Sequence, residues 1–146
     1  MSAPPDPVSA GARAAELLEE ACRPSEGAEK SLQLEVVRDL ALDLRHQLGA
    51  LTGLAREAAA PDVLAEAALR CADLANLAAC NVSKLPPERA PRAFAAARLA
   101  AGAVRDLRSL VEADSRELDG EHLENVLRDV RGAAWRAEFA ARQVQG

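Results

Sequence analysis

Bulky residues of the kind that fill a β-sheet are scarce in this chain of 146 residues. It has no isoleucine and no tyrosine, two phenylalanines, one tryptophan and ten valines, whereas alanine and leucine supply 34 and 21 residues. β-Branched and aromatic residues pack the pleated surface of a sheet, whereas alanine, leucine, glutamate and arginine are strong helix formers. The composition therefore excludes a sheet protein and predicts an all-α fold.

Other features that the sequence lacks exclude particular partners and locations. The formal net charge is −5, which argues against a nucleic-acid partner, because such a partner requires a clustered basic surface. No apolar run approaches the roughly 18 residues that span a bilayer, and the first nine residues lack the regions of a signal peptide. We therefore expect a cytoplasmic protein without a membrane partner.

The three cysteines, Cys22, Cys71 and Cys80, have no C-x-x-C spacing, and the two histidines, His46 and His122, belong to no Glu-x-x-His motif. This pattern favours small buried thiols over a disulfide framework or a zinc site. The histidines do not form the ligand sets that helical bundles use for metals. We expect neither a metal nor a cofactor.

Apolar residues at steps of three and four predict one short and four long helices. The prolines of the polar lead mark residues 1–8 as a flexible tail before a single domain, 9–146. We expect the helices to run from residue 7 or 9 to about 22, from a cap at Ser25 to before Pro61, from Pro61 to about 84, from 87–91 to about 117, and onward from a cap at Asp119. The economical arrangement is an antiparallel four-helix bundle with a short additional N-terminal helix laid across it.

Trp135 and Phe139 depart from the apolar stripe of the last predicted helix. They are four residues apart, so they share one side of that helix, where Arg128 and Arg142 flank them. Tryptophan and arginine are enriched at binding hot spots, and arginine can form cation–π contacts with tryptophan. The pattern favours a partner-binding surface; the alternative is that the pair packs beneath the first helix or the tail.

Leu42, Leu69 and Phe94 also lie off the core faces of their helices. Single exposed apolar residues are ordinary. Several on different helices indicate a homodimer or a protein partner, so we include Leu42 with the partner-binding residues.

His46 is the alternative site, as a phospho-acceptor. Residues 40–84 resemble the dimerisation hairpin of bacterial histidine kinases, since Asp43, Leu44, Arg45 and Leu48 match that family's helix. Leu42 occupies the position of the family's phospho-accepting histidine. His46 with Leu48 also resembles the acceptor turn of histidine-phosphotransfer proteins, which are four-helix bundles of about this size. These resemblances imply a signalling module.

Residues 63–81 and 96–114 resemble the helical cyclodeaminase and cyclohydrolase family, but the Pro-Gly-Gly-Gly-Ser segment of its folate site is missing. The chain also lacks a glycine-rich phosphate loop and a nucleophile elbow. The sequence therefore predicts a non-enzymatic bundle that binds itself or another protein in bacterial regulation or signalling, with a phosphotransfer module as the main alternative. A small-molecule-binding bundle and a cyclodeaminase-like remnant rank below these.

Overall fold

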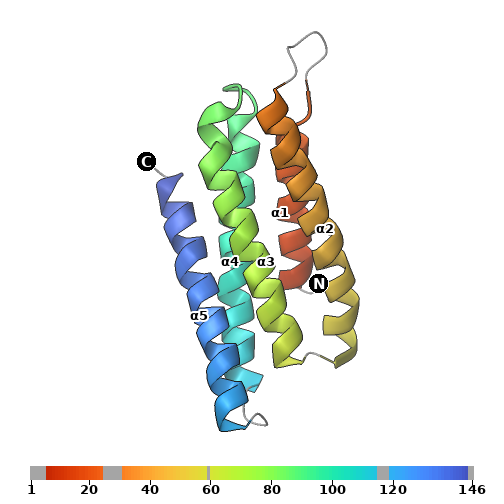
Figure 1. The fold of residues 1–146 in the computed structure, drawn as a ribbon, viewed down its shortest axis with the longest axis vertical. Helices are drawn as coiled ribbons and strands as arrows, with labels where there is room; N and C mark the ends of the chain where they lie inside the picture. The colour runs from red at the N-terminus through yellow and green to blue at the C-terminus, as the bar shows by residue number, and fades with distance from the viewer. Residues whose placement is uncertain (1–5, 25–30, 59, 115–118, 145–146) are drawn as a thin grey trace, which may run out of the picture.

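The computed structural model describes residues 6–24, 31–58, 60–114 and 119–144, and these residues form helices without any strand (Figure 1). The elements are α1 (Pro7–Ala21), α2 (Leu32–Ala58), α3 (Pro61–Asn81), the 3₁₀ turn η1 (Val82–Lys84), α4 (Ala90–Asp114) and α5 (Gly120–Gln143). The predicted all-α class is confirmed.

Local chemistry sets the ends of these helices. The Asp119 carboxylate accepts a hydrogen bond from the His122 backbone N–H at 3.0 Å, as the sequence predicts. Pro61 opens α3, again as predicted. Among the described residues, Ser31 caps α2, because its hydroxyl accepts a hydrogen bond from the backbone N–H of Leu34 at 3.3 Å. The predicted cap Ser25 lies outside the described residues.

The first helix begins earlier than the predicted domain boundary at residue 9. Asp6 caps α1 by accepting from the Val8 backbone N–H at 3.2 Å, and Pro7 occupies the first turn. Val8 is fully buried in the core, so Pro7 and Val8 belong to the folded domain rather than to a tail. Residues 1–5 of the predicted tail lie outside the described residues.

The helices are arranged differently from the predicted bundle. Successive helices run in opposite directions, and α1 lies lengthwise against α2 and α4, while α3 and α4 form the central pair (Figure 1). Helices α1 to α4 thus pack around one core, and α5 extends the same core by packing in the groove between α3 and α4. The short helix is therefore a full member of the core, and the last helix is the additional one.

Small residues make room for α1 in the core. Four of its seven buried residues are alanine or glycine, and the full set is Val8, Gly11, Ala14, Ala15, Leu18, Glu19 and Ala21. A Cβ atom added at Gly11 would overlap the Cys71 sulfur of α3 and would lie 3.4 Å from Leu48 Cδ1 of α2. The absence of a side chain at Gly11 therefore lets three helices meet at one point.

Candidate functional site

The α5 outer face is the surface of α5 that points away from the rest of the molecule. Its residues recur at helical spacing, with Arg131 and Gly132 adjacent at its centre, and all are exposed: Glu121, Glu124, Arg128, Arg131, Gly132, Trp135, Phe139 and Arg142. Trp135 is 70% exposed and Phe139 is 53% exposed. Their rings stack, with centroids 5.7 Å apart and planes inclined by 12°.

The burial of the opposite side of α5 explains this exposure. Val126, Val130 and Ala137 face the groove between α3 and α4, and Trp135 projects from the other side of the helix. The structure therefore brings together four predicted partner-binding residues, Trp135, Phe139, Arg128 and Arg142. The alternative that Trp135 packs beneath α1 is wrong.

The other two predicted site residues lie elsewhere. Leu42 is half-buried and His46 is exposed, and both belong to α2, which occupies the edge of the molecule opposite α5 (Figure 1). Grouping Leu42 with Trp135 was wrong, because their helices pack on opposite sides of the central pair.

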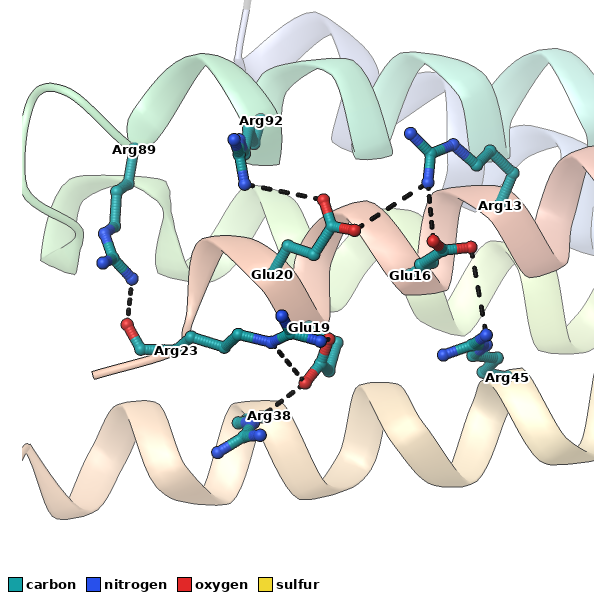
Figure 2. Close-up of polar contacts among 9 residues, drawn as sticks. All are labelled: Arg13, Glu16, Glu19, Glu20, Arg23, Arg38, Arg45, Arg89 and Arg92. Carbon is teal, nitrogen blue, oxygen red and sulfur yellow. Dashed lines mark hydrogen bonds and ion pairs between the residues drawn. The ribbon is translucent and has the colours of Figure 1, made fainter. Parts of the chain in front are cut away.

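A network of glutamates and arginines joins α1 to its neighbours (Figure 2). At its centre Glu19 is only 2% exposed, yet it is charged and paired. Arg23 donates to both of its carboxylate oxygens at 3.0 Å, and Arg38 of α2 donates to one of them at 3.0 Å. Burial raises the pKa of Glu19, but the hydrogen bonds and charges of Arg23 and Arg38 outweigh it, so the pKa lies below its usual value.

The remaining contacts of the network are longer or more exposed. Glu20 contacts Arg92 of α4 at 3.5 Å, and Glu16 contacts Arg45 of α2 at 4.0 Å (Figure 2). Arg89 donates to the backbone carbonyl of Arg23, next to these pairs. The network therefore fastens the last turns of α1 to both α2 and α4.

Beside this network lies a polar recess of about 640 Å³, which we call the arginine recess. It is lined by Glu20, Arg23, Pro24, Glu88, Arg89 and Arg92. Three arginines thus line one concavity, where the guanidinium groups of Arg23 and Arg92 pair with Glu19 and Glu20. Sequence reasoning missed this site, because its residues come from two segments that only the packing of α1 on α4 brings together.

The arginines that the sequence pattern assigned to a binding surface were Arg128 and Arg142 of α5, and neither those of the recess nor those farther along α4 were among them. There, Arg108 contacts Glu112 at 3.0 Å, one turn away, which is an ordinary exposed ion pair. The only feature of the sequence that pointed to the arginine recess was its abundance of arginine. That abundance does not show which arginines lie together in the fold.

The cysteines divide into two kinds. Burial raises the pKa of Cys22 to about 11 and that of Cys71 to about 12, so both thiols are inert. Cys80 is exposed, which corrects the prediction that all three are buried.

Two further kinds of feature, a metal site and a membrane span, would be visible among the described residues. Within them, no three histidine, cysteine or acidic side chains gather to hold a metal ion. None of the described helices combines the length and apolarity that a membrane crossing requires.

Three comparisons with known proteins were made. No family model matches the chain, and no curated protein matches it. Among solved structures, it is similar to formiminotetrahydrofolate cyclodeaminase from Thermotoga maritima, with a TM-score of 0.60 and 19% identity. The match covers 95% of this chain and 83% of the other.

This likeness concerns the fold, and it corrects one expectation. We predicted that the chain is not an enzyme, but the fold that spans nearly all of it is the fold of an enzyme. The missing Pro-Gly-Gly-Gly-Ser segment was therefore too narrow a ground for excluding an enzyme, since a fold can be retained when a local motif is not.

Proposed function

We propose that this chain is an enzyme of the cyclodeaminase fold that holds a carboxylate-bearing small molecule in the arginine recess. The observation that carries the proposal is the gathering of Arg23, Arg89 and Arg92 around one concavity of about 640 Å³. That volume lies within the range of about 300–1,000 Å³ that small-molecule sites occupy. The planar fork of a guanidinium group matches a carboxylate in geometry as well as in charge.

The folate class is the first ligand class to test. The structural neighbour acts, by its name, on formiminotetrahydrofolate, which carries carboxylates at one end and N–H groups at the other. The recess has groups for both ends, because Glu20 and Glu88 line it beside the arginines. Carboxylates accept hydrogen bonds from N–H groups, and they can exchange protons with a departing amine.

The test measures binding and turnover separately. Calorimetric titration with formiminotetrahydrofolate should give saturable binding, and an ammonia assay should detect deamination. Replacing Arg92 with alanine should weaken binding by about tenfold or more, because a charged hydrogen-bond partner is lost. Folding should be little affected, since the Arg92–Glu20 pair is exposed and 3.5 Å long.

Arg108→Ala is the matched control. Arg108 lies on the same helix but outside the arginine recess, in an ion pair with Glu112. Binding equal to that of the unchanged chain is expected. An equal loss in both variants, or no saturable binding to the unchanged chain, would refute the proposed site, and binding without ammonia release would refute the deamination of this substrate.

A further inference from the structure

The α5 outer face leaves the largest aromatic side chain of the protein in solvent. Trp135 is 70% exposed and Phe139 53% exposed, on a helix at the edge of the molecule (Figure 1). Charged residues border this pair along the same face. A stacked aromatic pair with a charged rim is typical of a protein interaction site.

The order of residues along this face is self-complementary. Arg128 and Trp135 lie at equal distances from a point between Arg131 and Gly132, and so do Glu121 and Arg142. In a two-fold pair of antiparallel helices, residues equally distant from the axis meet across the interface. We propose that two copies of this chain pair through α5, antiparallel, with the two-fold axis between Arg131 and Gly132.

Two of the meetings in this register are chemically favourable, and the register also places Glu124 opposite Phe139 of the other copy. Arg128 of one copy lies over the Trp135 ring of the other, which is a cation–π geometry. Glu121 meets Arg142 of the other copy, and both pairs occur twice because of the symmetry. A parallel pair would instead place Glu121 beside Glu121 and Arg142 beside Arg142. The distribution of charge therefore selects a second, antiparallel copy as the occupant.

Gly132 lies beside the proposed axis, where the two helices approach most closely. It is exposed in the middle of α5, and a Cβ added there would have no neighbour within 4 Å in the chain. Glycine is unfavourable inside a helix, so packing within one chain does not account for it. A second helix crossing at this point uses the missing side chain for close backbone approach.

The size of the apolar pair indicates the strength of the dimer. From the area of an aromatic side chain and these exposures, Trp135 and Phe139 offer about 200–300 Å² per chain. A standard interface buries roughly 800 Å² per partner. The charged rim must supply the remainder, and we expect a reversible dimer with a dissociation constant of the order of micromolar. This pairing does not depend on the ligand of the arginine recess.

The fluorescence of Trp135 can report dimer formation directly, because the chain has one tryptophan and no tyrosine. Sedimentation of the full chain across micromolar concentrations should show dimer formation, and tryptophan emission should shift to shorter wavelength over the same range. Trp135→Ala should weaken the dimer at least about 30-fold, as expected for a hot spot. Leu54→Ala is the matched control, since Leu54 is 51% exposed on α2.

A charge exchange tests the register. Glu121→Arg and Arg142→Glu should each weaken the dimer about fivefold, because each change places like charges together at two positions. The double variant should recover most of that loss. Greater stability of the monomer would not explain the recovered dimer. Glu121→Arg places a positive charge in the first turn of α5 and Arg142→Glu a negative charge in its last turn, and both charges oppose the helix dipole.

The outcomes separate the surface from its register. A chain that stays monomeric, or a dimer lost in Leu54→Ala and kept in Trp135→Ala, overturns the α5 interface. A dimer that needs Trp135 but is not recovered by the double charge exchange overturns the antiparallel register.

Discussion

Replacing Gly11 with alanine tests whether the close meeting of α1, α2 and α3 depends on a missing side chain. The new Cβ would overlap the sulfur of Cys71, a fully buried residue, and would touch Leu48. Overpacking of this kind costs about 1–3 kcal/mol. Alanine also favours a helix over glycine by about 0.8–1 kcal/mol, so the net loss of unfolding free energy should be about 0–2 kcal/mol.

Gly49→Ala is the matched control for this helix propensity. Gly49 is an exposed residue within α2, and a Cβ there would meet nothing within 4 Å. That variant should gain about 0.8–1 kcal/mol. Gly11→Ala should therefore be less stable than Gly49→Ala by about 1–3 kcal/mol, which is the overpacking contribution alone.

A double-mutant cycle with Cys71→Ala identifies the clashing atom. Removing the sulfur gives the new Cβ its space, so Gly11→Ala in the Cys71→Ala background should be stabilising, with a coupling of about 1–3 kcal/mol. Urea unfolding followed by far-ultraviolet circular dichroism measures each stability. If Gly11→Ala is as stabilising as Gly49→Ala, or if Cys71→Ala brings no relief, the reasoning is wrong.

Three further predictions concern single side chains. The lowered pKa of Glu19 contributes stability above its unfolded value, about 4.5, and this contribution is lost as the pH falls through the folded pKa. Glu19→Gln should therefore lose about 1–3 kcal/mol at neutral pH, measured by urea unfolding, and this deficit should narrow in acid. A thiol reagent at mildly alkaline pH should modify Cys80 quickly, while Cys22 and Cys71 react only on unfolding. Mass spectrometry measures the rate of modification of each cysteine, and equal rates for the three would contradict their assigned burial. Asp119→Ala should lower the melting temperature through the loss of the α5 cap, about 1 kcal/mol, and an unchanged melting temperature would count against that cap.

The helix ends were largely predictable, since they depend on neighbours in the sequence. Pro61 and Asp119 act on the first turn of their own helices, so their effect needs no knowledge of the fold. The departure of Trp135 and Phe139 from the buried stripe of α5 was also predictable from helical periodicity, whereas their exposure required the structure. The same periodicity places His46 away from the apolar stripe of α2, where the structure has it exposed.

The positions of the helices relative to one another were not predictable from periodicity. An amphipathic stripe shows which face of a helix is buried but not which helix buries it. For that reason Leu42 was wrongly grouped with Trp135, and Arg23 was not associated with Arg92. Self-complementarity along α5 is visible in the sequence once α5 is known to be an outer helix.

By itself, the sequence determined the all-α class, the number of described helices and the departure of Trp135 and Phe139 from the apolar stripe, because composition, caps and periodicity act over a few residues. Only the tertiary structure decided that α1 joins the core between α2 and α4, that α5 packs along the far side of α3 and α4, and that Arg23, Arg89 and Arg92 share a recess. These outcomes depend on how closely helices far apart in sequence can pack. At Gly11, that closeness depends on a side chain the residue does not have.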